Sequence, residues 1–274
     1  MNQNNKNHGR VELKNLFKNG NIPSENDFNF LIDSTINKQD DGFSKNVEEG
    51  FVIAATNTSE KLITFYNNPD EMDPSFSIDV INKGAALKIS PFTQDNNKDI
   101  KEENTAHNDN TGFFFHKEGK LGIGKLTDKN YVLDVNGFAA SKGRIGTFKC
   151  GSVPADGKWH AVIKDLDNCQ AFELIARTGL VQTGLFAILH AIALSAFGGK
   201  SKSKITKTSA CYGFYWNKIS VKWTGTTHNY SLMLRTNRNY GKDAAGKDVS
   251  IFYNITKLWD DENFMPEAYF YNEQ

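Results

Sequence analysis

Regular alternation of apolar and polar residues in the C-terminal half is the feature that most limits how this chain can fold. Apolar side chains recur at every second position in residues 219–223, 230–234 and 249–255. A period of two is typical of strands that turn one face to a core and the other to water. Segments rich in Gly, Asn and Lys separate these runs. The pattern therefore predicts an antiparallel β-sandwich in this half.

Two longer apolar runs precede these strands. Phe172–Thr178 and Leu185–Ser195 flank Gly179–Gly184, which fits a hairpin. Leu185–Phe197 is rich in Ala and Leu, so a buried helix is the alternative, but the neighbouring strands favour a strand. Its 13 residues are fewer than the ~20 that a membrane-spanning helix needs. Within these runs we expect His190 to lie in the core, and we expect the same of Trp223 further along.

Short strands broken by turns are expected in the middle of the chain. The predicted strands are Phe51–Ala55, Leu62–Tyr66, Phe76–Val80, Ala86–Ile89, Phe113–His116, Lys120–Ile123 and Tyr131–Val135. Between them, Thr93–Asn110 is almost wholly polar and is expected to be a mobile loop. Residues 42–149 are therefore predicted to form a small β-rich, shaft-like domain.

The N-terminal segment, residues 1–41, is the helical part of the chain. Val11–Asn37 predicts two short helices, with Gly20 ending the first and Ser24 as the N-cap of the second. Two such helices cannot bury both of their apolar stripes within themselves, so we expect them to dock on a partner. The predicted attachment residues are Leu13, Leu16, Phe17, Phe28, Leu31 and Ile32.

The predicted fold class is thus mainly β. A short helical attachment segment leads to a shaft-like β domain, and residues 150–274 form a C-terminal β-sandwich head domain. The beginning of the sequence has no apolar core or small-residue cleavage site of the secretory kind, so we expect synthesis in the cytoplasm without a signal peptide.

Charge is distributed unevenly, although the whole chain is neutral. Residues 1–141 carry 15 basic and 21 acidic side chains, and residues 142–274 carry 17 and 11. The basic C-terminal half is first explained by a solvated basic face, with an anionic partner such as an acidic glycan or a cell surface as the alternative. The largest lysine cluster, from Lys200 to Lys207, lies among Gly and Ser and is expected to be an exposed turn. No nucleic-acid-binding motif is present, so nucleic acid is not an expected partner.

The sequence offers little support for catalysis or for a cofactor. Three widely spaced cysteines (Cys150, Cys169 and Cys211) and six scattered histidines form no metal-ligand motif, so we expect no metal. Gly122-Ile-Gly124 lacks the third glycine and the helix of a dinucleotide site, and tight turns explain its glycines better.

Two catalytic sets could still be assembled from this sequence. A Ser195–His190–Asp165 set lacks the nucleophile motif that supports such a triad. A carboxylate pair such as Asp165 and Glu173 leaves a polysaccharide-degrading enzyme as an alternative. We predict no catalytic residues and no cofactor.

Aromatic residues in the basic half are the better indication of function. Aromatic rings beside Asn, Lys and Arg are typical of sugar-binding surfaces, where they stack and hydrogen-bond, although large aromatics also fill sandwich cores. The predicted ligand-binding residues are Tyr215, Trp216, Arg235, Arg238 and Tyr240.

Two glycine-rich motifs carry a resemblance to a known group of proteins. Gly119-Lys-Leu-Gly-Ile-Gly124 followed by Tyr131-Val-Leu-Asp-Val-Asn-Gly137 resembles the "GxxGIG…YxLDVNG" signature of phage tail-fibre and related bacterial surface-fibre proteins. Further segments, including Val153–His160 and Leu189–Ser195, resemble a C-terminal domain of Bacteroidetes proteins from phage-tail-like loci, contractile injection systems among them. The resemblance covers about residues 112–259, without the long repeats or the autocleaving end that many tail fibres carry.

The resemblance implies a non-enzymatic structural protein and adhesin. Such a protein docks on a virion-like or extracellular contractile particle by its N-terminus, forms a homotrimer, and binds a cell-surface receptor, glycan or protein, with its C-terminal domain. A purely architectural adaptor without an external ligand is a further alternative.

Overall fold

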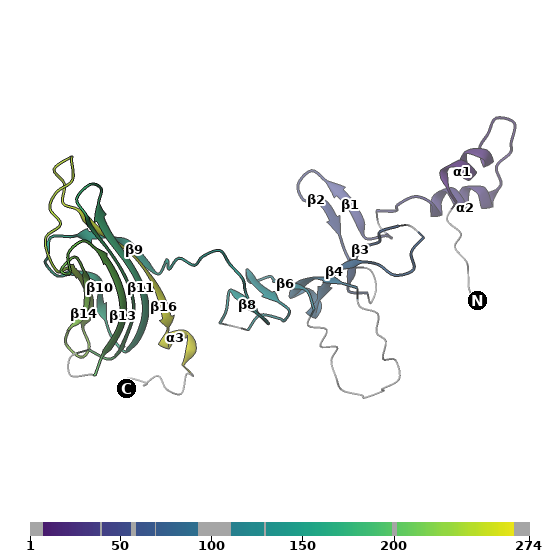
Figure 1. Ribbon diagram of the computed structural model, residues 1–274. Helices are drawn as coiled ribbons and strands as arrows, with labels where there is room; N and C mark the ends of the chain where they lie inside the picture. The colour runs from purple at the N-terminus through teal and green to yellow at the C-terminus, as the bar shows by residue number, and fades with distance from the viewer. Residues whose placement is uncertain are drawn as a thin grey trace. The chain divides into compact units, whose positions relative to one another are not determined.

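A computed structural model describes residues 8–38, 40–55, 59–68, 70–92, 111–128, 130–198 and 202–265 (Figure 1). The protein is mainly β with short N-terminal helices, as the sequence predicts. Its chain divides into two compact units, residues 1–139 and 140–274. The extended residues 140–148 thus belong with the second unit. The loop predicted over Thr93–Asn110 lies outside the described residues.

The N-terminal helices form where the sequence predicts them. Helix α1 spans Arg10–Leu16 and α2 spans Glu25–Asp33. The Ser24 hydroxyl accepts a hydrogen bond from the amide of Asp27, whose carboxylate accepts one from the amide of Ser24 at 2.7 Å. This reciprocal capping box fixes the start of α2. Helix α1 ends earlier than predicted, before Gly20.

A hairpin and one larger sheet follow in the first unit. The strands are β1 (Phe43–Asn46), β2 (Gly50–Ile53), β3 (Lys61–Phe65), β4 (Phe76–Ile81), β5 (Ala86–Pro91), β6 (Phe113–His116), β7 (Lys120–Ile123) and β8 (Leu133–Val135), with the 3-10 turn η1 (Asn82–Gly84) between β4 and β5. Strands β1 and β2 pair only with each other, and β3 to β8 form a sheet in chain order. Neighbours in this sheet are antiparallel except β7 and β8, which are parallel.

The glycines of the Gly122-Ile-Gly124 motif serve the backbone. A Cβ at Gly122 would lie 2.0 Å from the carbonyl oxygen of Lys125, so only glycine fits beneath this turn. Gly124 has a φ of 71°, in the region that favours glycine. Strand β8 follows rather than a helix, so no helix N-terminus is present here to bind a phosphate.

The second unit is a sandwich of two sheets. Its elements are β9 (Lys149–Pro154), β10 (His160–Leu166), β11 (Cys169–Leu180), β12 (Leu185–Ala196), β13 (Lys204–Tyr212), β14 (Ile219–Gly225), β15 (Tyr230–Thr236), β16 (Ser250–Trp259) and α3 (Asp261–Phe264). One sheet has the order β13-β12-β11-β16-β9 and the other has the order β10-β15-β14. All pairs are antiparallel.

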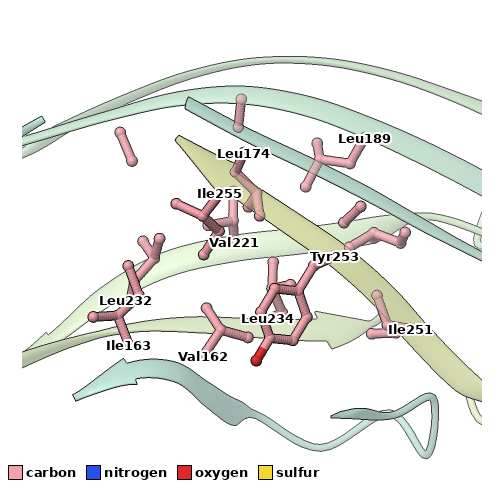
Figure 2. Packing of buried hydrophobic residues seen from close by; sticks show 14 of the residues in the cluster. Val162, Ile163, Leu174, Leu189, Val221, Leu232, Leu234, Ile251, Tyr253 and Ile255 are labelled. Atoms are coloured by element: carbon pink, nitrogen blue, oxygen red, sulfur yellow. The ribbon is translucent and has the colours of Figure 1, made fainter. Parts of the chain in front are cut away.

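The main apolar core lies between these two sheets (Figure 2). Leu174, Leu189 and Ile255 point inward from the five-stranded sheet and meet Leu232 and Leu234 from the three-stranded sheet; all five are fully buried. Trp223 packs against this core, as its phase in β14 predicts. The alternation in the sequence thus determines which face of each strand packs in the core.

Strands β12 and β13 hold three features for which the sequence made a prediction. The run from Leu185 is strand β12, which settles the choice between strand and helix. Lys204 and Lys207 lie within β13 and not in a turn, because this segment pairs along the edge of β12. The prediction that His190 lies in the core is wrong. His190 lies on the outer face of β12, and its side chain is 46% exposed.

No helix in the described part of the chain is both long and apolar enough to cross a membrane.

Candidate functional site

Two cations converge on one tryptophan on the outer face of the three-stranded sheet. The ammonium nitrogen of Lys222 and the guanidinium carbon of Arg235 each lie 4.5 Å from the centre of the Trp159 ring. Lys222 comes from edge strand β14, Arg235 from the central strand β15, and Trp159 directly precedes β10. Cation–π contacts of this kind contribute about 0.5–2 kcal/mol each. Both charges therefore lie against the same ring.

These two cations have no carboxylate partner in the described part of the chain. Among the described residues, neither Lys222 nor Arg235 forms an ion pair. The Nε of Arg235 is buried and donates no hydrogen bond to any described residue. Strands β14 and β15 contain no acidic residue at all. Their positive charge is thus not neutralised by any described carboxylate.

The nearest acid to Trp159 in the sequence is already engaged. The carboxylate of Asp156 lies 2.7 Å from Nε2 of His160 and accepts a hydrogen bond from the amide of Lys158. Burial by itself raises the pKa of Asp156, but these two hydrogen bonds outweigh it and lower that pKa from its ordinary value. Asp156 is therefore ionised at neutral pH and held by its own turn.

An exposed aromatic group lies on the turn between β13 and β14. Tyr212, Phe214, Tyr215 and Trp216 are 56–68% exposed, and the rings of Tyr215 and Trp216 meet edge-to-face at 5.4 Å. The ammonium of Lys218 lies 4.2 Å from the centre of the Tyr215 ring.

Buried Asn217 fixes the shape of this aromatic turn. Its Nδ2 donates to the carbonyl of Tyr212 at 2.9 Å, and its own amide donates to the carbonyl of Phe214. The turn is therefore ordered even though its rings point into solvent.

The aromatic turn and the basic sheet face adjoin each other. Lys218 begins the run into β14, and its carbonyl accepts a hydrogen bond from the amide of Asn237 at 2.9 Å. Asn237 directly follows β15, the strand that carries Arg235, and precedes exposed Arg238. We call the surface made by Trp159, Tyr215, Trp216, Lys218, Lys222, Arg235 and Arg238 the basic–aromatic surface.

Strand register places this surface at a defined end of the sandwich. Pro154 pairs with Ser250, and Leu180 pairs with Leu185, at the end where the aromatic turn lies against Gly184. Lys149, where the chain enters β9, lies at the opposite end of the five-stranded sheet. The aromatic turn is thus at the end of the sandwich away from where the chain enters it.

Four of the five predicted ligand-binding residues belong to the basic–aromatic surface. Tyr215, Trp216, Arg235 and Arg238 lie there, whereas Tyr240 is 2% exposed and belongs to the core. The amide of Tyr240 donates a hydrogen bond to the carbonyl of Ala155, and this holds the Tyr240 backbone beside a buried residue of the core. We therefore leave Tyr240 out of the surface.

Sequence reasoning did not select three members of the surface: Trp159, Lys218 and Lys222. Lys222 alternates with inward-facing Val221 and Trp223, so the sequence predicts that it points outward. The sequence does not predict its contact with Trp159, because that contact depends on β10 and β14 both pairing with β15.

A shallow hollow of about 380 Å³ adjoins the aromatic turn on the outer face of the five-stranded sheet. Arg177, Phe186, Ile188 and Tyr212 are among the residues that line it. Arg177 forms no ion pair within the described part of the chain. The hollow is thus apolar with one cation at its wall.

The predicted attachment residues lie on a loosely packed helical hairpin. The ring centres of Phe17, which directly follows α1, and Phe28 in α2 lie 5.5 Å apart. Leu13 and Leu16 are half-buried, whereas Phe28, Leu31 and Ile32 are 38–61% exposed. Neither helix contains a buried residue. Much of the apolar stripe is therefore uncovered.

The Ser195–His190–Asp165 set does not assemble. Ser195 and His190 point to opposite faces of β12, because their positions differ by an odd number. The Ser195 hydroxyl donates to the carbonyl of Phe197, and Nε2 of His190 lies 3.0 Å from the Glu173 carboxylate. His190 therefore cannot act as a base for this hydroxyl.

The carboxylate pair of the enzyme alternative is also separated. Glu173 lies on the outer face of the five-stranded sheet, where His190 and Arg144 hold its two oxygens. Asp165 lies on β10 of the other sheet. No group of three or more potential metal-ligating His, Cys, Asp or Glu side chains occurs among the residues that the structure describes.

Comparisons with known proteins give little similarity. No protein-family model matches the chain, and no curated protein matches it. Among solved structures, the tailspike protein of the Acinetobacter phage vB_ApiP_P1 is similar over 44% of this chain and 24% of its own length, with 12% identity and a TM-score of 0.26. This chain thus spans about a quarter of that protein, and a TM-score this low supports no argument about fold or function.

Proposed function

We propose that this protein is a structural and adhesive component of a phage-tail-like particle, either a tail fibre or a fibre of a contractile injection system. Its C-terminal sandwich binds an anionic glycan on a cell surface, and its N-terminal hairpin docks on the particle. The protein is not an enzyme. This proposal combines the motif resemblance of residues 112–259 with the chemistry of the basic–aromatic surface.

The single observation that carries the binding part is the placement of Lys222 and Arg235 on Trp159. Two cations beside an aromatic ring, without a carboxylate partner among the described residues, match the carboxylates or sulfates and the apolar ring faces of an acidic sugar chain. Tyr215 and Trp216 extend this surface with two exposed rings. Their position at the end of the sandwich away from the chain entry suits a receptor-binding head.

The remaining parts of the proposal concern assembly. Exposed Phe28, Leu31 and Ile32 on the helical hairpin offer the apolar contact that docking needs. The fibre is a homotrimer, as the resemblance implies. It acts outside the producing cell, on the particle that carries it.

Binding of the full-length protein to immobilised polysaccharides tests the ligand class. Three probes are used: a polyuronate, a sulfated polysaccharide, and a neutral dextran as the reference. We expect retention on the acidic probes and none on dextran. The double variant Lys222→Ala/Arg235→Ala is expected to lose at least about tenfold in affinity, because charge-assisted hydrogen bonds contribute about 1.5–3 kcal/mol each.

Lys207→Ala is the matched control, because Lys207 is an exposed lysine of the same unit on the other sheet. It is expected to bind like the wild type. Equal affinity of the double variant and the control would overturn the assignment of the surface. Release of soluble oligosaccharide from the acidic probes would instead favour an enzyme.

A further inference from the structure

One face of the six-stranded sheet in the first unit is entirely apolar. Cross-strand partners lie on the same face, and pairing links Phe65 to Phe76 and links Ile89 to Phe113. The same register brings the following residues to this face: Ile63, Phe65, Phe76, Ile78, Val80, Leu87, Ile89, Pro91, Phe113, Phe115, Leu121, Ile123, Leu133 and Val135. We call it the apolar sheet face.

The opposite face of this sheet has a different character. It carries polar side chains such as Thr64, Ser77, Asp79 and Lys88, together with buried Phe114. The sheet is thus two-sided, with its charges on one side only. A sheet with this pattern normally buries its apolar side against a second layer.

That second layer is missing from the described part of the chain. The large side chains Phe65, Phe76, Phe113, Phe115 and Leu133 are between 44% and 58% exposed. None of the residues on the apolar sheet face is buried. The sandwich of the second unit, by contrast, has a complete core of its own.

The connection between β5 and β6 does not have the composition to cover this face. Residues 93–110 lie outside the described residues, but their sequence includes only one large apolar residue, Ile100. One such residue cannot match a face that extends over six strands. Neither the described residues of the first unit nor the composition of this connection therefore supplies a cover for the face.

We infer that the apolar sheet face packs against the same face of other copies of this chain. The first part of the chain is net acidic, with 15 basic and 21 acidic residues before position 142. Copies of an acidic unit repel each other, and a contact face without charged residues adds no close like-charge pair to that repulsion. Every copy supplies the same uncharged surface, so the contact is self-complementary.

The size of the face supports an interface between copies. Five half-exposed large side chains present roughly 400–500 Å² of apolar surface, since a phenylalanine buries about 150–250 Å² when covered. That area alone is comparable to the largest apolar patch of a typical monomer, about 300–600 Å². The half-buried residues between them extend it toward the roughly 800 Å² per partner of a stable interface.

The inference rests on the self-association in the proposed function and assigns its interface. Its test is the solution mass of full-length wild type, Phe65→Glu/Phe113→Glu and Thr64→Glu, measured by light scattering. Thr64 neighbours Phe65 on β3 but points to the opposite face, so Thr64→Glu adds a charge without touching the interface. We expect the double variant to be a monomer and Thr64→Glu to keep the wild-type mass.

Far-UV circular dichroism separates loss of the interface from loss of the fold. All four tryptophans lie in the second unit, so their fluorescence checks that this unit is unchanged in each variant. If the double variant unfolds, Phe65→Ser/Phe113→Ser replaces it and is expected to lower the mass without adding charge. An oligomeric, folded double variant would overturn the interface alone, whereas a monomeric wild type would also overturn the proposed self-association.

Discussion

The guanidinium of Arg235 lies against the ring of Trp159, 4.5 Å from the ring centre, on the outer face of the three-stranded sheet. Lys222 approaches the same ring at the same distance from the neighbouring edge strand. Trp159 thus contacts two cations that have no carboxylate partner among the described residues. Removing the ring removes the arrangement while both charges remain in the chain.

Trp159→Ala is therefore expected to weaken binding to an acidic polysaccharide by about two- to thirtyfold. The loss corresponds to one or two cation–π contacts, at about 0.5–1 kcal/mol each at an exposed site. Titration calorimetry or surface plasmon resonance on the full-length protein measures it. Trp259→Ala is the control, since Trp259 lies at the far end of β16 near α3. Equal losses in both variants would speak against a specific role of Trp159.

Binding to acidic polysaccharide is expected to depend on ionic strength. Raising salt from about 0.05 M to about 0.3 M shortens the Debye length from about 14 Å to about 6 Å and weakens exposed charge contacts. We expect an affinity loss of roughly tenfold for the wild type and a smaller loss for Lys222→Ala/Arg235→Ala. The measurement is the slope of log affinity against log salt. An identical slope in both proteins would mean that other cations carry the attraction.

Two buried tyrosines give opposite predictions for the loss of a hydroxyl. The Tyr230 hydroxyl donates to the carbonyl of Asn168 at 2.7 Å, whereas the Tyr240 hydroxyl is buried without a hydrogen-bond partner among the described residues. Tyr230→Phe is expected to cost about 1 kcal/mol and Tyr240→Phe to be neutral or stabilising. Urea unfolding followed by tryptophan fluorescence compares them. A larger cost for Tyr240→Phe than for Tyr230→Phe would contradict these hydrogen-bond assignments.

Alkaline pH is expected to destabilise the sandwich because Tyr230 and Tyr240 are buried. Burial raises the pKa of Tyr230 and of Tyr240 to about 12, above the ordinary value near 10. Between these values the unfolded chain has lost protons that the folded chain keeps, so stability falls as pH rises from about 10 through 12. Each Tyr→Phe variant is expected to lessen this fall. An unchanged alkaline transition in Tyr230→Phe/Tyr240→Phe would show that other groups cause it.

The sandwich core predicts a contrast between two aliphatic residues. Leu234 is fully buried between the sheets, whereas Ile188 is 49% exposed on the outer face of β12. Leu234→Ala is expected to cost about 2–5 kcal/mol, because it leaves a cavity. Ile188→Ala is expected to cost about 1 kcal/mol or less. The same unfolding measurement checks both, and equal costs would contradict the assignment of the dry face.

Local patterns in the sequence predict much of this fold. Short runs between turns predict strands such as Lys120–Ile123 and Phe113–His116 at their observed bounds, and Ser24 and Asp27 predict the start of α2. These features depend on neighbours in the chain, so they are readable without the structure. The outward position of Arg235 in β15 is of the same kind.

Features that depend on which strands are neighbours were not predictable in this way. His190 has apolar neighbours on both sides in sequence, yet it faces outward toward Glu173, since β11 and β12 pair. Tyr240 follows Arg238 in the loop after β15, yet its ring lies in the core, where its amide donates a hydrogen bond to the carbonyl of Ala155 on another segment. The apolar sheet face likewise appears only once the register of six strands is known.

The solution mass of the purified full-length protein tests the central claim, a self-assembled fibre, most directly. Light scattering over a range of concentrations is predicted to give a constant mass of about 92 kDa, three times the 30.7 kDa of one chain. A mass of 30.7 kDa at every concentration would contradict the account, because the apolar sheet face would then stay exposed to water in a stable monomer.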